Sequence, residues 1–162
     1  MSGAQRELSF RFLAEPGDVN YGGKVHGGAV MKWIDQVGYA AAVGWSGHYS
    51  VTVAVGGIRF VAPVRIGDLV TVCAKLVYTG TTSMHFAVDV RARDPMDDAA
   101  NERLCTHCVI VFVALDRPEG EATAVPPWQP RDEEDRQLAD YAKQVMALSR
   151  DIEQAVARLR TA

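Results

Sequence analysis

Residues Pro16–Trp45 read PGDVNYGGKVHGGAVMKWIDQVGYAAAVGW and decide the fold. The first part is a glycine-rich loop that is typical of turns. The second part, from about Gly27 to Trp45, has the length of a helix but is apolar on nearly every side, and two charged residues, Lys32 and Asp35, interrupt it. This pattern is typical of a helix that is enclosed by protein rather than lying on a surface. The sequence therefore predicts a central helix around which the rest of the domain is wrapped.

Strand patterns lie on both sides of this helix. Residues Glu7 to Ala14 alternate between apolar and polar side chains before it, as a half-buried strand does. Four further strands are predicted after it, joined by short hairpins, at residues 51–61, 69–78, 83–91 and 104–115. One early strand, one enclosed helix and four later strands indicate an α+β domain in which a single antiparallel sheet curls round the helix.

The amino-acid composition changes after Asp116. Residues 117–131 form a Pro-rich linker, and residues 132–162 form an amphipathic C-terminal helix, which leaves 1–116 as the main domain. The apolar positions of this helix are spaced three and four apart, at Leu138, Tyr141, Val145, Leu148, Ile152, Ala155 and Leu159. Two interpretations stay open: the stripe docks on the helix's own domain, or it packs on a partner helix and contributes to subunit assembly.

Composition excludes several classes of function. The chain has 162 residues, is 48% hydrophobic and carries a formal net charge of −3, as expected of one soluble domain. It has no block of basic residues, so we expect no nucleic acid as partner. Its apolar stretches fall short of the roughly 20 residues that a membrane span needs. No signal-peptide pattern opens the sequence, and we therefore expect a cytoplasmic protein without a membrane partner.

Cysteines offer little evidence for redox or metal chemistry. Cys105 and Cys108 form a C-x-x-C motif, but the motif lies in a predicted strand and has no second pair of ligands elsewhere. Three positions apart on a strand, the two side chains are expected to point to opposite faces. We predict two small core residues, no metal site and no cofactor.

The position of Asp35 in an apolar helix most needs an explanation. A carboxylate buried in an apolar helix costs several kcal/mol unless it is paired, hydrogen-bonded or used in chemistry. Small residues at Gly38 and Ala42 are expected to leave room beside it for a ligand or a second backbone. A salt bridge to Lys32 or Arg59 is the structural alternative, and a catalytic base is the functional one.

The loop before the helix favours the functional alternative. Asn20 offers both a hydrogen-bond donor and an acceptor. Gly27 and Gly28 open the helix, where free backbone N–H groups can hold a developing negative charge. Together these groups suit hydrolysis of an activated acyl group, with water deprotonated by Asp35 and the carbonyl oxygen polarised at Gly28. His26 precedes the two glycines and is expected to line the same site.

The run PGDVNYGGKVHGGAVMKWIDQVGYAAA, followed by VTVAVGGIRFVAPVRIGDLVTVCAKLVYTGTTSM, resembles the hotdog-fold acyl-CoA thioesterases of the cytosolic acyl-CoA hydrolase group. That group includes short bacterial enzymes and brain-type tandem-domain enzymes. The resemblance extends from about Glu7 to Asp116. Its most specific parts are an asparagine followed by GG-x-x-x-GG, an aspartate seven residues after the last glycine, and F-x-x-P-x-x-x-G-D at Phe60–Asp68.

The resemblance implies a hotdog fold, in which a curled antiparallel sheet wraps the central helix, and thioester hydrolysis of acyl-CoA at a dimer interface. Asn20 would come from one subunit and position water or the carbonyl. Asp35 would come from the other subunit and act as general base or nucleophile, with the backbone of Gly27 and Gly28 as oxyanion site. A homodimer would then hold two complete sites, and a higher homo-oligomer such as a hexamer is expected.

The loop after the third strand departs from the family pattern. It often carries a basic residue that meets the phosphates of coenzyme A, whereas this chain has hydroxyl residues there, including Thr81, Thr82 and Ser83. Hydroxyls and backbone amides can still bind phosphate, and Arg59 is a further candidate. Two alternatives to hydrolysis stay open: a hotdog hydratase or dehydratase, and a non-catalytic acyl-CoA-binding module.

Overall fold

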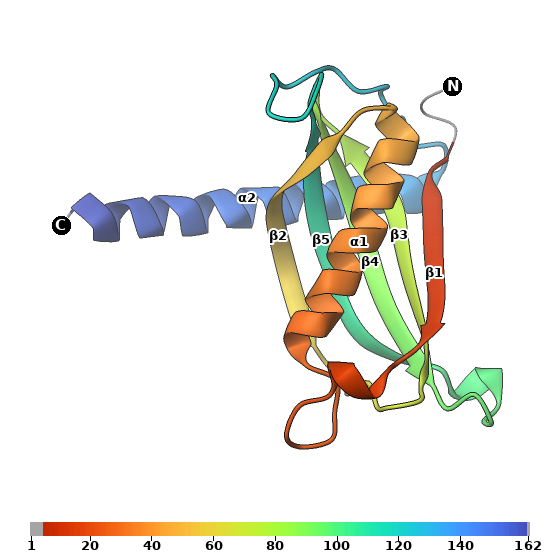
Figure 1. Ribbon diagram of the computed structural model, residues 1–162. Helices are drawn as coiled ribbons and strands as arrows, with labels where there is room; N and C mark the ends of the chain where they lie inside the picture. The colour runs from red at the N-terminus through yellow and green to blue at the C-terminus, as the bar shows by residue number, and fades with distance from the viewer. Residues whose placement is uncertain (1–4, 162) are drawn as a thin grey trace.

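The computed structural model describes residues 5–161 (Figure 1). One antiparallel sheet has α1 on one face and α2 on the other, which we call the outer face. This arrangement confirms the predicted α+β hotdog fold. The strands are β1 (Glu7–Leu13), β2 (Ser50–Phe60), β3 (Leu69–Thr79), β4 (Ser83–Arg93) and β5 (Arg103–Ala114); the α-helices are α1 (Gly27–Ser46) and α2 (Glu133–Thr161), and two short 3₁₀ helices cover Pro16–Asp18 and Ala99–Asn101.

The strand order in the sheet is β1-β3-β4-β5-β2. β3, β4 and β5 form consecutive hairpins, as predicted, but the prediction was wrong for β2. β2 pairs with β5, and the chain then crosses from one edge of the sheet to pair β3 with β1. Because β1 and β2 occupy opposite edges, the sheet can curl round α1, which follows β1 and precedes β2 in the chain.

α1 packs closely on the sheet. It ends at Gly47, whose φ of 71° is the left-handed cap that glycine adopts most easily. Val37 and Ala42 are fully buried on its sheet-facing side. A Cβ at Gly38 would lie 2.7 Å from the Phe112 ring, so glycine allows helix and strand to approach. Gly38 therefore serves the approach of a second backbone, one of the two uses expected of it, and not a space for a ligand.

The opposite face of α1 is open in the single chain. Met31 and Tyr39 are 44% and 40% exposed, and Asp35 is exposed between them. The sheet is wide enough to cover one side of the helix, so the predicted enclosure is incomplete within one protomer. An apolar helix face left uncovered is the kind of surface that a second subunit buries.

The segment after β5 is packed against the domain. Val125 and Trp128 are buried, and the backbone oxygen of Pro126 accepts a hydrogen bond of 2.8 Å from Trp45 Nε1. Arg6 lies over the Trp128 ring, 4.4 Å from its centre, and forms a salt bridge with Asp135 at the start of α2. These contacts fix the point at which α2 begins to cross the outer face.

α2 confirms docking on its own domain for its first half, and packing on a partner helix stays a prediction. Its first half docks on its own sheet, where Ala139 and Ala142 are buried. Its second half projects past β2 and leaves Ile152 and Leu159 exposed (Figure 1). Within the described chain, neither α-helix combines the length and apolarity that a membrane crossing requires.

Cys105 and Cys108 lie in the same hydrophobic core cluster. The prediction that they point to opposite faces was wrong, because Cys105 is the extra residue of a bulge in the β4–β5 ladder and the bulge resets the alternation. Burial raises the pKa of the Cys108 thiol to about 12 and also raises that of Cys105. Two protonated, buried thiols fit their predicted role as core residues.

Candidate active site

Asp35 lies two turns into α1 and lines a pocket between this helix and the sheet. Apolar side chains form most of the wall, and Gly28 lies at the start of the same helix face; the other lining residues are Met31, Lys32, Ile34, Val55, Ile58 and Ile110. Asp35 is exposed, so the predicted burial of its carboxylate was wrong for the isolated protomer. Ile34 and Ile110 are 1% exposed and close the inner end of the pocket.

Thr52 on β2 is the hydrogen-bond partner of Asp35. Its Oγ1 donates to Asp35 Oδ1 at 2.5 Å. Among residues 5–161 no salt bridge reaches Asp35, so the structural alternative of an ion pair with Lys32 or Arg59 is wrong. Sequence reasoning missed Thr52, because a hydroxyl residue in an alternating strand carries no local signal of a partner 17 positions away.

The N-terminus of α1 faces the same pocket as Asp35. Gly28 and Asp35 are seven residues apart, which places them on one helix face with about 10 Å between them along the axis. The side chain of the N-cap residue His26 forms no capping hydrogen bond, so the first-turn N–H groups have no side-chain partner there. A Cβ at Gly28 would meet nothing within 4 Å. A carbonyl oxygen can therefore approach these N–H groups directly.

Asn20 is held by its own loop. Its Oδ1 accepts hydrogen bonds from the backbone N–H groups of Gly22 and Lys24, at 2.9 and 3.2 Å. These two bonds orient the side-chain amide and occupy its acceptor. The amide NH₂ is the end of the side chain that stays available to a ligand.

Asn20 and Asp35 are not brought together within one protomer. Asn20 lines a different pocket, with Lys24, Gly27, Val30, Phe60 and residues 61–64. Gly27 and Gly28 thus lie at the junction of the two pockets, one lining each. His26 is exposed at this junction, and its backbone N–H donates to Asp18 O at 2.8 Å.

The residues proposed for coenzyme A lie at opposite ends of the sheet. Arg59 is exposed beside Phe60, whose ring contacts Gly27 at the start of α1. Thr81 and Thr82 lie in the turn between β3 and β4, and Ser83 is the first residue of β4, at the end of the sheet where α1 finishes (Figure 1). One protomer therefore does not gather these candidates around Asp35.

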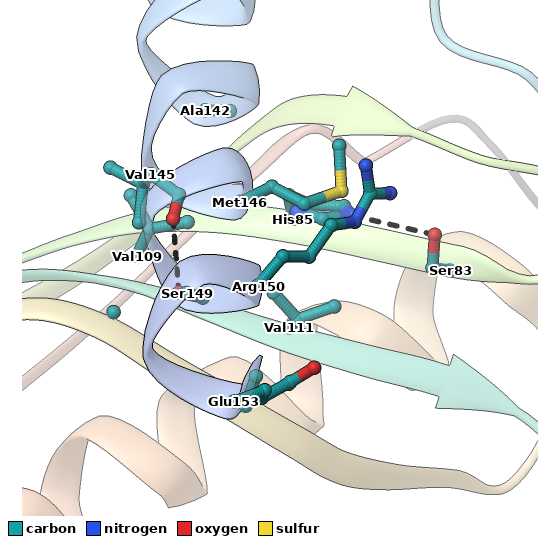
Figure 2. Close-up of a pocket in the computed structure, with 12 residues that line it drawn as sticks. Ser83, His85, Val109, Val111, Ala142, Val145, Met146, Ser149, Arg150 and Glu153 are labelled. Carbon is teal, nitrogen blue, oxygen red and sulfur yellow. Dashed lines mark hydrogen bonds between the residues drawn. The ribbon is translucent and has the colours of Figure 1, made fainter. Parts of the chain in front are cut away.

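Ser83 faces α2. Figure 2 shows Ser83 and His85 on β4 beneath Met146 and Arg150 of α2, in a pocket on the outer face of the sheet. Ser83 Oγ and His85 Nε2 are 3.4 Å apart. Burial lowers the pKa of His85 to about 4, because the charged imidazolium is poorly solvated there. The side chain of Ser83 thus belongs to the α2 contact, on the face opposite Asp35.

Comparison with known proteins gives consistent matches. A family model described as the thioesterase superfamily matches residues 22–114. Acyl-CoA thioester hydrolase YciA of Escherichia coli (strain K12) is 35% identical over 123 residues, which cover 75% of this chain and 92% of that protein. A hexameric thioesterase from Yersinia pestis has a TM-score of 0.66 at 31% identity, over 72% of this chain and 93% of that chain.

An acyl-CoA hydrolase from Staphylococcus aureus, solved with butyryl coenzyme A, matches over nearly the whole chain. Its TM-score is 0.81 at 29% identity, with 99% of this chain and 98% of that chain covered. Further structures of that hydrolase carry alanine in place of an asparagine, of an aspartate 15 positions later and of a threonine 17 positions after that. Asn20, Asp35 and Thr52 follow one another at the same two spacings in this chain.

Proposed function

Because the chain belongs to the thioesterase superfamily, we propose that it is an acyl-CoA thioesterase that hydrolyses acyl-CoA to a free acid and coenzyme A. The observation that carries the proposal is the pocket of Asp35, where a carboxylate oriented by Thr52 lies beside an apolar wall that can hold an acyl chain. The first-turn N–H groups that receive the carbonyl oxygen come from α1 of the partner subunit together with Asn20, because Gly27 and Asn20 line one pocket. The hydrolase relatives favour hydrolysis over hydration or simple binding.

The chemistry follows from the placement of these groups. The thioester carbonyl oxygen binds at the first-turn N–H groups of one subunit, which stabilise the negative charge that develops on it. In the other subunit, one oxygen of Asp35 is held by Thr52, and the second oxygen accepts a proton as water attacks the carbonyl carbon. The C–S bond then breaks, the sulfur takes the proton from Asp35, and the free acid and the thiol of coenzyme A leave. Direct attack by the same carboxylate oxygen is the alternative, and it would form a mixed anhydride.

Asn20 completes the site from the partner subunit in this proposal. The separate pockets of Asn20 and Asp35 support it, since neither pocket holds both groups within a protomer. The loop that carries Asn20 projects from the end of the domain, and its Tyr21 is fully exposed. β2 is an edge strand with Val53 54% exposed, next to the open face of α1. A homodimer would bury these surfaces together.

Asn20 is proposed to act as a hydrogen-bond donor. Its acceptor oxygen is used inside the loop, so the NH₂ group is what it presents to the thioester carbonyl or to the attacking water. Thr52 is proposed as a positioning residue that fixes the rotamer of Asp35. The matching spacing of the substituted asparagine, aspartate and threonine in the Staphylococcus aureus hydrolase supports both assignments.

The wall of the pocket and the wider assembly follow the same proposal. Met31, Ile58 and Ile110 would hold the acyl chain, and coenzyme A would leave along the exposed surface. Contacts of Arg59 and of Thr81, Thr82 and Ser83 with coenzyme A remain predictions. These residues lie at opposite ends of the sheet, so both groups would meet one substrate only if they came from different subunits.

A hexamer is proposed because thioesterase relatives are hexameric. The cytoplasm stays the predicted compartment.

Release of free thiol from a panel of acyl-CoA substrates tests the function. Wild-type protein should hydrolyse acyl-CoA, and Asp35→Ala should lower kcat by about 10²–10⁴-fold, as loss of a general base does. Gln36→Ala is the matched control, because Gln36 is the next exposed residue of α1 but lines a different surface hollow. Full turnover by Asp35→Ala, with the control also active, would show that the proposed mechanism is wrong.

A further inference from the structure

The second half of α2 carries a surface that the domain itself does not cover. The first half is fixed: Tyr141 Oη is 2.8 Å from His107 Nε2 on β5, and a Cβ at Gly56 on β2 would lie 2.5 Å from Val145 Cγ1. α2 therefore reaches β2 at about Val145 and Ser149, both of which lie against Gly56. β2 is the edge of the sheet, so α2 leaves its own domain there.

The overhang of α2 is long. Residues 150–161 extend for about 18 Å at 1.5 Å per residue. Neighbouring strands lie about 4.8 Å apart, so this length corresponds to nearly four strand spacings. Figure 1 shows the overhang continuing past β2 in the direction in which the helix crosses the sheet.

The apolar stripe of α2 continues along the overhang. Leu148, Ile152, Val156 and Leu159 are 63%, 65%, 39% and 79% exposed. They follow Val145 at spacings of three and four, and thus lie on the side of the helix that meets the sheet. Polar residues such as Gln154 and Arg158 occupy the opposite side. A row of exposed apolar side chains in line with a docked one indicates an interface.

The occupant that fits this surface is a second copy of the chain. A subunit that covers the free edge of β2 and the open face of α1, as in the proposed homodimer, places its own sheet beside that edge. Its outer face then lies where the overhang runs. A hollow between β2 and α2, lined by Val55, Gly56, Leu148 and Ile152 among others, opens at this seam.

We propose that residues 148–159 of α2 pack across the dimer interface on the outer face of the partner subunit's sheet. The arrangement is reciprocal, so each subunit contributes the same contact. The helix then acts as a clamp on the dimer that holds Asn20 and Asp35 in one site. This inference rests on the homodimer of the proposed function. It adds an interface distinct from the α1 and β2 surfaces that carry the site.

Sedimentation velocity over a range of protein concentrations tests the clamp. Ile152→Asp and Leu159→Asp place a carboxylate on the stripe, and each should weaken dimerisation at least tenfold. Gln154→Asp adds the same charge on the opposite side of the helix and should leave dimerisation unchanged. Ile152 is exposed in the protomer, so its substitution should leave the circular dichroism spectrum of the fold intact.

Three outcomes would overturn the clamp. Dimers of Ile152→Asp and Leu159→Asp as strong as wild type would do so, and so would an equal loss in Gln154→Asp. Dissociation of a hexamer into intact dimers would assign the stripe to another interface. The hydrolysis assay separates this inference from the function, because an inactive wild-type dimer that Ile152→Asp still dissociates would refute the function and leave the clamp standing.

Discussion

Thr52 Oγ1 donates a hydrogen bond to Asp35 Oδ1 at 2.5 Å and thereby ties the central helix to the edge strand of the sheet. Asp35 is exposed and has no salt bridge within residues 5–161, so this bond sets the direction of its carboxylate. A general base works only when its free oxygen faces the water that it deprotonates. Thr52 thus gives the exposed carboxylate the orientation that burial would otherwise provide.

Thr52→Val should lower kcat about tenfold and leave KM within twofold, because the substitution removes the hydroxyl and keeps the shape of the side chain. Thr52→Ser, which keeps the hydroxyl, should restore most of the rate. Steady-state kinetics on one acyl-CoA substrate measures both. Equal rates for the valine and serine variants would mean that the hydroxyl has no role in positioning Asp35.

Asn20→Asp should lower kcat at least tenfold although it is nearly isosteric. The new carboxylate can still accept the N–H groups of Gly22 and Lys24, but it has no NH₂ group to donate. Deuterium exchange of the loop amides serves as the control and should show the loop as ordered as in wild type. Activity equal to wild type would refute a donor role for Asn20.

Gly38→Ala should destabilise the domain by about 1–3 kcal/mol, since its Cβ would lie 2.7 Å from the buried Phe112 ring. Gly44→Ala in the same helix is the matched control. Its Cβ would meet only the flexible end of Gln5, and alanine should stabilise the helix by about 0.5–1 kcal/mol. Urea unfolding of both variants measures the difference, and a neutral Gly38→Ala would show that the packing is looser than described.

His85 should make stability depend on pH. Burial lowers its pKa to about 4 from an ordinary value of 6.5, so between these values the unfolded state binds the proton and the folded state does not. Stability is therefore complete above pH 6.5 and falls as pH is lowered towards 4, by about 3 kcal/mol from this group. The slope of unfolding free energy against pH should be smaller in His85→Gln than in wild type or in His48→Gln. Identical slopes in all three would contradict a buried neutral His85.

The main elements of the fold could be predicted because their signals are periodic and local. The alternation of residues 7–14 and the apolar run from Gly27 place β1 and α1 to within a residue or two. The position of β2 beside β5 could not be predicted, since it depends on how the sheet closes round α1. The face to which Cys105 points depends on a single bulge, which leaves no trace in a pattern of apolar and polar residues.

The candidate site, like the fold, could be predicted from the sequence only in part. Asp35 is conspicuous because a carboxylate interrupts an apolar helix, and Asn20 and Gly28 are conspicuous because they lie directly before that helix and in its first turn. The exposure of Asp35 could not be predicted, because an apolar helix has the same pattern whether its own sheet or a partner subunit covers it. Thr52 reaches Asp35 through tertiary structure alone. The apolar stripe of α2 was predictable, but the point at which its own domain stops covering it was not.

The most direct test of the account is activity in a mixed dimer. Asn20→Ala and Asp35→Ala homodimers should both be nearly inactive. A verified heterodimer of the two variants has one site with both native residues and one with neither, so it should recover about half of the wild-type hydrolysis of acyl-CoA. A heterodimer with no recovered activity would contradict a site built from Asn20 of one subunit and Asp35 of the other.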